Sequence, residues 1–222
     1  MAESAGTMVS GILDGLDEDD RRALRARMQR KRFAKGEVIF HEGDSGEVLH
    51  LIEKGHVSLR VATPDGDTAV LRVLGPGDMF GEYVLIASGP RAATVTALDV
   101  VETMCLGQDD FHRLRAEHSY LDALLLDSAI REVRRLSAAL LDALYLPVQQ
   151  RVLRRLVEVA DLYGAENANV VPISQSDLAG LAGVTRQTTN RVLAKAQESG
   201  VIRLRRGNIE ILHPEALADL AR

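Results

Sequence analysis

Between positions 185 and 206 the sequence carries side chains of the kinds that bind the edges of DNA bases. Projected at about 100° per residue, a helix over 186–199 places Arg186, Gln187, Asn190 and Arg191 on one side. Arginine forms bidentate hydrogen bonds with guanine O6 and N7, and glutamine or asparagine can do so with adenine N6 and N7. We therefore expect these four side chains to contact base edges in the major groove of a duplex.

Five further polar residues complete the predicted set of DNA contacts. A threonine can cap the start of the helix, and hydroxyl groups near a helix start can reach backbone phosphates. Two arginines lie at the tip of a hairpin predicted over 201–211, which turns at Gly207 and Asn208. The five residues are Ser174, Thr185, Thr188, Arg205 and Arg206.

The neighbouring residues predict how these groups are positioned. Ser174 is a capping residue for a short helix over 175–182, and Gly183 permits a tight turn into the next helix. A helix pair centred on glycine is a weak signal alone, because many helical hairpins look alike. The order of cap, turn, two-faced helix and basic hairpin is more specific and predicts a winged helix-turn-helix. The side of the second helix expected to be buried carries Thr189, Val192, Leu193 and Ala196.

The charge distribution agrees with a polyanionic partner for this part of the chain. The net charge of the 222 residues is −5, yet residues 147–222 carry ten Lys and Arg against eight Asp and Glu. Between 185 and 206 the local excess is +5, because only Glu198 opposes six basic residues. Such a cluster is the electrostatic footprint of a nucleic-acid site. The alternative is a solvated basic face with no partner.

A long helix is predicted over 119–146, from Ser119 to Leu146. Its apolar residues follow the a and d spacing of a coiled coil for about three heptads. A helix of about 27 residues spans about 40 Å, which favours a subunit interface, although it could instead pack on its own chain. Pro147 should interrupt the helix, so we place a domain boundary there. The predicted dimer seam consists of Leu126, Ile130, Val133, Ser137, Leu140 and Leu144.

The first half of the chain predicts a helix from Leu16 to about Gln29 and then a small all-β barrel or roll. Short apolar or alternating runs separated by Gly, Pro and Asp indicate its strands. The fold class is therefore α+β, with a sensor domain over 1–118, a dimerisation helix over 119–146 and a DNA-binding domain over 147–222. The predicted strands are Glu37–Phe40, Val48–Ile52, Val57–Val61, Ala69–Leu74, Thr94–Leu98 and Val101–Leu106.

The composition excludes several classes of protein. Cys105 is the single cysteine, so the chain cannot form an internal disulfide or a cluster of thiolate ligands. The first ten residues lack the basic and apolar regions of a secretory leader, and no stretch is apolar enough to span a membrane. We expect a soluble, cytoplasmic, non-membrane protein without a metal site.

The chain resembles the family of the cyclic-AMP receptor protein and FNR (CRP/FNR) from about residue 10 to residue 220. The resemblance rests on the segments GPGDMFGE at 75–82 and VTRQTTNR at 184–191 and on the long helix between them. It implies a β-roll of the double-stranded jelly-roll type, a coiled-coil homodimer and a winged helix-turn-helix. It also implies RNA polymerase as a partner and ligand-driven reorientation of the DNA-binding domains. The twofold symmetry of such a dimer predicts a palindromic operator with half-sites one helical turn apart.

Within the resemblance, Arg186 and Arg191 match the base-reading arginines, whereas Gln187 replaces a glutamate of the cyclic-AMP receptor. Glu82 would accept a hydrogen bond from a ribose hydroxyl, and Arg91 would pair with a cyclic phosphate. The ligand could accordingly be cyclic AMP or another cyclic nucleotide. The implied ligand-binding set is Gly81, Glu82, Tyr83, Arg91, Ala92, Leu136 and Ser137.

Parts of that set depart from the family pattern. Ala92 and Ala93 follow Arg91 where cyclic-AMP binders place a hydroxyl residue, and Tyr83 and Val84 crowd the loop. Leu136 replaces a threonine that contacts adenine. Ser137 aligns with a serine that reaches adenine across the dimer. Two alternatives to cyclic AMP therefore remain. The site could bind a different effector, or it could have lost ligand binding, with Glu82 and Arg91 forming a structural pair.

Three other classes of function, a metal- or haem-based sensor, a protein-binding module and an enzyme, are less compatible with the sequence. An iron-sulfur sensor conflicts with a single cysteine, and a haem sensor would need a histidine such as His41, His50 or His56. A cyclic-nucleotide module that acts on a protein partner conflicts with the basic helix at 186–199. An enzyme that uses Cys105 and a nearby histidine finds no further support, because the thiol lies in an apolar strand.

Overall fold

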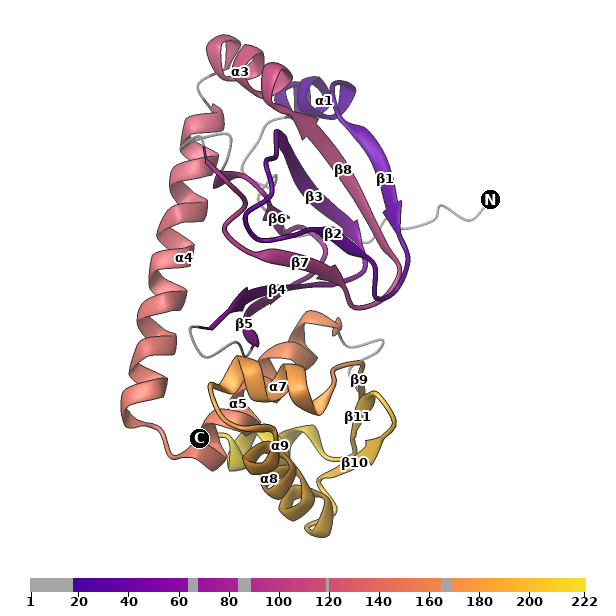
Figure 1. The fold of residues 1–222 in the computed structure, drawn as a ribbon, viewed down its shortest axis with the longest axis vertical. Coiled ribbons are helices and arrows are strands. Elements are labelled where there is room, and N and C mark those ends of the chain that lie inside the picture. The colour runs from indigo at the N-terminus through magenta and orange to yellow at the C-terminus, as the bar shows by residue number, and fades with distance from the viewer. Residues whose placement is uncertain (1–17, 64–67, 84–88, 119, 165–168) are drawn as a thin grey trace.

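The computed structural model describes residues 18–63, 68–83, 89–118, 120–164 and 169–222. A β-roll occupies one end of the molecule, and a mostly helical C-terminal unit (residues 148–220) occupies the other (Figure 1). One long helix runs along the side of both (Figure 1). The predicted helix starts at Leu16 and Ser119, and the crowding residue Val84, lie outside the described residues.

The β-roll consists of two antiparallel sheets. Their facing sides bury a shared core because successive side chains of a strand alternate between the two faces. Strand β8 shows this alternation, with Val101, Thr103 and Cys105 buried and Glu102 and Met104 half-buried. The first sheet has the order β1 (Gln29–Phe33), β8 (Val101–Gly107), β3 (Val48–Lys54) and β6 (Met79–Phe80). The second has the order β2 (Val38–Phe40), β7 (Thr94–Ala97), β4 (Val57–Ala62) and β5 (Thr68–Leu74).

Two helices cover the outer face of the first sheet. Helix α1 (Glu18–Ala26) and helix α3 (Gln108–Glu117) bury Leu24, Phe111 and Leu114 against apolar residues of β3 and β8. The expectation that the first helix extends to Gln29 is wrong, because it ends at Ala26 and Gln29 opens strand β1. Strand β6 and helix α3 were not predicted.

Helix α4 (Tyr120–Tyr145) has 26 residues and two distinct faces. One face contacts the β-roll, where the side chain of Arg135 donates to the Leu71 carbonyl oxygen at 3.4 Å. The other face carries a stripe of apolar side chains that the chain itself leaves exposed. The exposed stripe contains Leu126, Ile130, Val133, Leu136, Leu140, Leu141, Leu144 and Tyr145.

The helix then breaks, as predicted, because Pro147 caps helix α5 (Val148–Leu162). Two arginines of α5 fix the junction: Arg154 and Arg155 pair with the buried Asp142 of α4 at 2.7 and 3.1 Å. Arg151 also donates to the Ala143 carbonyl oxygen at 3.2 Å, near the end of α4 where carbonyl groups lack helical partners.

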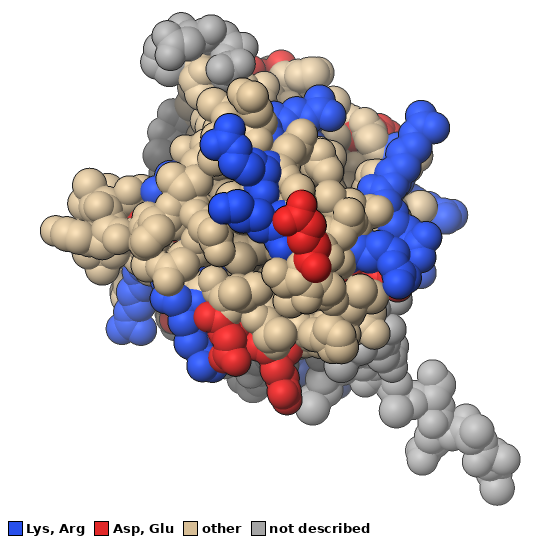
Figure 2. Space-filling model, turned by 90° about the horizontal axis from the view of Figure 1, so that it is seen from below, with Lys and Arg blue, Asp and Glu red and all other residues tan. Residues whose placement is uncertain are grey.

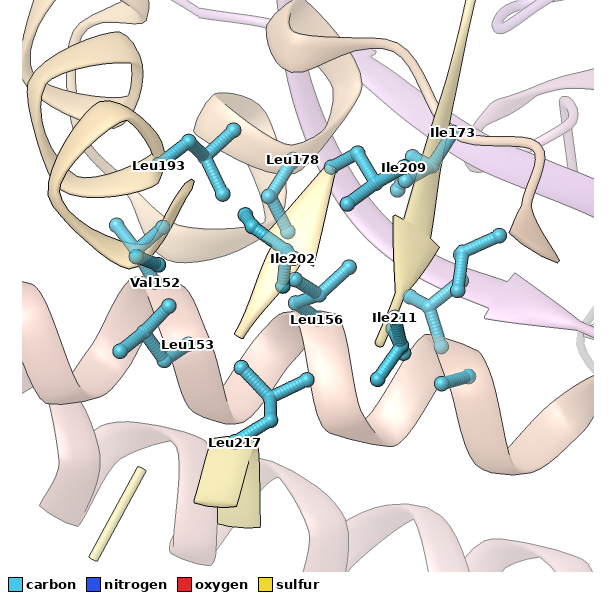
Figure 3. Packing of buried hydrophobic residues seen from close by; sticks show 14 of the residues in the cluster. Val152, Leu153, Leu156, Ile173, Leu178, Leu193, Ile202, Ile209, Ile211 and Leu217 are labelled. Carbon is cyan, nitrogen blue, oxygen red and sulfur yellow. The ribbon is translucent and has the colours of Figure 1, made fainter. Parts of the chain in front are cut away.

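The C-terminal unit buries one apolar core among its helices and strands (Figure 3). Side chains of α5, such as Leu156, meet Leu178, Leu193 and Ile202 from three later elements (Figure 3). Strand β9 and helix α9 were not predicted, whereas the other elements lie within one or two residues of their predicted bounds. The unit contains β9 (Val170–Val171), α7 (Gln175–Ala182), α8 (Arg186–Glu198), β10 (Ile202–Arg205), β11 (Asn208–Ile211) and α9 (Pro214–Leu220).

The β-roll packs directly on the C-terminal unit. Val73 of β5 and Leu98 belong to the apolar core of that unit, and α7 lies next to β5 (Figure 1). A second contact involves the buried His56, whose ring lies 3.7 Å from the ring of Tyr163 and whose Nε2 lies 3.2 Å from the Leu162 carbonyl oxygen. The two parts therefore meet through packed side chains as well as through α4.

Candidate nucleic-acid interface and effector cavity

Local hydrogen bonds fix both helices of the helix-turn-helix as the sequence predicted. The Ser174 hydroxyl accepts from the Asp177 backbone N–H at 3.0 Å, and the Thr185 hydroxyl accepts from the Thr188 N–H at 3.2 Å. Each cap satisfies a backbone donor that has no helical partner. Gly183 ends α7 with φ of 61°, a left-handed conformation that glycine adopts without strain.

Helix α8 separates its side chains as predicted. Thr189, Val192, Leu193 and Ala196 are buried, whereas Arg186, Gln187, Asn190 and Arg191 are exposed. Within the described part of the chain, none of these four exposed side chains makes a hydrogen bond or ion pair to another residue. Viewed from below, the end of the molecule where α8 lies carries several basic side chains with acidic ones between them (Figure 2).

The hairpin of β10 and β11 forms beside this helix, but part of its charge is neutralised within it. Glu210 accepts from Arg205 at 3.0 Å and from Arg203 at 3.3 Å. The hydrogen bond from Arg205 and the charge of Arg203 hold the pKa of Glu210 below its usual range. Arg205, predicted to contact phosphate, is thus held by a carboxylate in the free protein. Arg206 has no such partner among the described residues.

A cavity of about 120 Å³ lies between the second sheet, the β6 turn and helix α4. It brings together five of the predicted ligand-binding residues: Gly81, Glu82, Tyr83, Arg91 and Ala92. Leu136 and Ser137 do not line it. They lie on the exposed side of α4, where the Ser137 hydroxyl donates to the Val133 carbonyl oxygen at 2.9 Å. In this conformation neither residue contacts the cavity of its own chain.

Arg91 is a buried cation that forms no ion pair with a carboxylate among the described residues. Its guanidinium donates to the carbonyl oxygens of Gly81 and Val48 at 3.0 and 2.9 Å and lies 4.1 Å from the centre of the Phe40 ring. Its Nε is buried and has no hydrogen-bond partner in the part of the chain that the structure describes. Desolvation lowers the pKa of Arg91. The charges of Glu82 and Asp44 offset only part of this desolvation, so the buried guanidinium favours an anion in the cavity.

The alternative of a structural pair between Glu82 and Arg91 finds no support, because these two described residues form no ion pair. Burial raises the pKa of Glu82 despite the nearby charges of Arg72 and Arg91. Its carboxyl group is therefore available at the cavity rather than held by a cation.

Helix α4 contributes three polar residues to the cavity that sequence reasoning missed: Ser128, Glu132 and Arg135. Arg135 donates to both oxygens of Glu132, at 2.7 and 2.9 Å, and Arg72 of β5 donates to the same carboxylate at 3.3 Å. The Arg135 hydrogen bond lowers the pKa of Glu132. Spacings of four and three residues place Ser128, Glu132 and Arg135 on one face of the helix, distinct from the predicted dimer seam. This spacing is the feature of the sequence that could have predicted a second, polar face of α4.

Comparison with known proteins agrees with this architecture. The family model of the cyclic nucleotide-binding domain matches residues 30–118, and that of the Crp-like helix-turn-helix domain matches residues 150–220. A CRP-like cAMP-activated global transcriptional regulator of Mycobacterium tuberculosis is 30% identical over 217 residues, covering 96% of this chain and 97% of its own. The chain belongs to the CRP/FNR family of transcription regulators.

Two further relatives extend the comparison of this CRP/FNR-family regulator. The cyclic AMP receptor protein of Thermus thermophilus is 31% identical and covers 96% of this chain and 97% of its own. The structure of a CRP-family transcriptional regulator from the same organism has a TM-score of 0.74 and 26% identity, covering 86% of this chain and 96% of that one. The chain is thus a DNA-binding transcription regulator and belongs to a family of regulators, not of enzymes.

The buried histidine and cysteine of the CRP/FNR-family regulator form a structural pair. His50 Nδ1 lies 3.3 Å from Cys105 Sγ, and its ring stacks on Phe80 at 4.8 Å. Burial lowers the pKa of His50 to about 3 and raises the pKa of Cys105, so both side chains are neutral near pH 7.

The described residues contain no cluster of three or more His, Cys, Asp or Glu suited to a metal. Among them, no helix is long and apolar enough to cross a bilayer.

We expect His50 to make the stability of the β-roll depend on pH. The unfolded chain binds a proton near pH 6.5, whereas folded His50 stays neutral until about pH 3. Unfolding therefore takes up a proton between these values, and stability should fall as the pH falls from 6.5 towards 3. Chemical denaturation of His50→Gln should show a flatter pH dependence than the wild type, with His112→Gln as the matched control. Parallel profiles for His50→Gln and the wild type would contradict this account.

Proposed function

We propose that this regulator binds a palindromic operator as a homodimer, with one helix α8 in the major groove of each half-site, under the control of a small anionic effector. The observation that carries the proposal is the polar face of α8, whose four side chains have hydrogen-bonding groups but no partner among the described residues. Arginine, glutamine and asparagine are the residue types that read base edges.

The exposed stripe on α4 supports a twofold interface. Leu126, Val133 and Leu144 are each more than 60% exposed, which is unusual for aligned large apolar side chains on one helix. A second copy of α4 would bury them at the spacing of a coiled coil. In this proposal residues 1–118 form the sensor, 119–146 the dimerisation helix and 147–222 the DNA-binding domain.

Cyclic AMP is the proposed effector. Its cyclic phosphate would compensate the charge of Arg91, and its ribose hydroxyl would donate to Glu82. The M. tuberculosis relative is described as cAMP-activated, which supports the same ligand class here. Because Ala92 supplies no hydroxyl donor, the phosphate would depend more heavily on Arg91 and on backbone N–H groups.

The cavity must enlarge to admit such a ligand. Its volume of about 120 Å³ is below the roughly 300 Å³ at which small-molecule sites begin. The wall contributed by α4 is held against β5 by the ion pair of Glu132 with Arg72 and by the hydrogen bond from Arg135 to the Leu71 carbonyl oxygen. Movement of α4 would therefore accompany binding, and Ser137 and Leu136 of a partner chain could then approach the base.

Family membership also supports RNA polymerase as a partner.

Replacement of Arg186 by alanine should weaken binding to the preferred operator by about 1 to 3 kcal/mol and relax the preference at one base step. The operator would first be selected from random duplexes, and affinities measured by fluorescence anisotropy on the selected and singly substituted sequences. Arg222→Ala removes the same charge from the residue that follows the end of helix α9 and is the matched control. Wild-type affinity and preference in Arg186→Ala would contradict the assignment of α8.

Replacement of Arg91 by alanine should abolish cyclic-nucleotide binding, because the cavity loses its only buried cation among the described residues that line it. Isothermal titration calorimetry with cyclic AMP and cyclic GMP measures this directly and also distinguishes the two ligands. Arg91→Gln preserves more of the side-chain volume and should fail in the same way. Arg113→Ala, on helix α3, is the control. Unchanged binding by Arg91→Ala would remove Arg91 from the site.

A further inference from the structure

Strand β5 contacts both the effector cavity and the C-terminal unit. Leu59 pairs with Arg72 and Arg60 pairs with Val70, so Leu71 is the extra residue of a β-bulge. Leu71 lines the cavity, whereas Val73 belongs to the apolar core of the C-terminal unit. A β-bulge redirects the side chains around it, which explains how neighbouring residues of one strand serve two different surfaces.

The contact between β5 and α7 requires a residue without a side chain at position 180. A Cβ atom on Gly180 would lie 2.9 Å from both the backbone nitrogen and Cγ2 of Val70. Glycine inside a helix costs about 1 kcal/mol relative to alanine. At this position the absence of a side chain allows α7 to approach the backbone of β5.

An ion pair joins the same two surfaces. Arg60, the cross-strand partner of Val70, pairs with Asp177 at 2.9 Å, and Asp177 lies three residues before Gly180 on α7. The Asp177 carboxylate also accepts from the Ser174 hydroxyl at 2.8 Å. One carboxylate therefore links the start of the helix-turn-helix to the β-roll, and its side chain is only 17% exposed.

Helices α7 and α8 form one packed body. Their turn is closed by the Val184 N–H, which donates to the Ala179 carbonyl oxygen at 3.1 Å, and Leu178 and Leu193 share the same core. A displacement of α7 relative to β5 would therefore displace α8 as well.

We propose that Gly180 and the Arg60–Asp177 pair are positioning residues, which hold α7 on β5 and so set the relative placement of the two α8 helices of a dimer. This inference rests on the proposed function. Both half-sites can be occupied together only when the two helices lie about one helical turn apart. Once one half-site is bound, contact with the second is effectively intramolecular. The affinity that this second contact adds depends on the spacing of the two α8 helices.

The test is the ratio of two affinities in Gly180→Ala. One duplex carries the selected palindrome, and the other carries one half-site with the second half scrambled. The new methyl group meets backbone at position 70, so α7 must move, while the helix itself gains a better helix former. We expect the affinity for the palindrome to fall at least about fivefold and the affinity for the single half-site to be retained.

Two further variants make the result specific. Gly107→Ala is the matched control, because a Cβ there meets no atom within 4 Å and the backbone has an ordinary φ of −75°. Arg60→Ala removes the ion pair while leaving the Ser174 cap intact, and it should lower the same ratio. An unchanged ratio in Gly180→Ala would overturn this inference alone. Failure of the wild type to prefer the selected palindrome over a scrambled duplex would overturn the proposed function as well.

Discussion

A helix can offer polar side chains to a groove of DNA only when its opposite side is held firmly by a core. In this protein Val192, Leu193 and Ala196 supply that hold for α8, packed on α5 and α7 in the apolar core of the C-terminal unit. The capping bonds of Ser174 and Thr185 fix where the two helices begin. The contact of α7 with β5 therefore positions the exposed polar side of α8 relative to the effector cavity through this packed body.

The effector cavity differs from this packed core, because the buried guanidinium of Arg91 keeps one nitrogen without a hydrogen-bond partner among the described residues. Arg91 is buried, donates only to backbone carbonyl oxygens and leaves Nε without a partner. The neighbouring carboxyl of Glu82 forms no ion pair with a described residue, and burial raises its pKa. Buried titratable groups with shifted pKa values in one cavity are typical of a site completed by a ligand. The Glu132 network with Arg72 and Arg135 then connects that site to the helix proposed to form the dimer.

The sequence was most informative where local chemistry determines structure. Caps, the glycine turn and the two faces of α8 each depend on residues within one or two helical turns, so their prediction was confirmed closely. Strand β1 was missed because Gln29–Phe33 is a basic run without apolar alternation, stabilised by its pairing with β8. The charged α4 residues at the cavity were missed because they contact segments distant in the sequence, such as Arg72 of β5. The Arg205–Glu210 pair was missed although it is local, because it depends on how strands β10 and β11 pair in the hairpin.

In the proposed dimer, two copies of α8 are presented together at the spacing of successive major grooves. The distance between spin labels at position 187 (Gln187→Cys, with Cys105→Ser) reports this spacing, measured by double electron-electron resonance with operator and cyclic AMP present. We expect a single population corresponding to helices about 34 to 36 Å apart. Absence of any intermolecular distance, or one too short or too long for two half-sites, would contradict it.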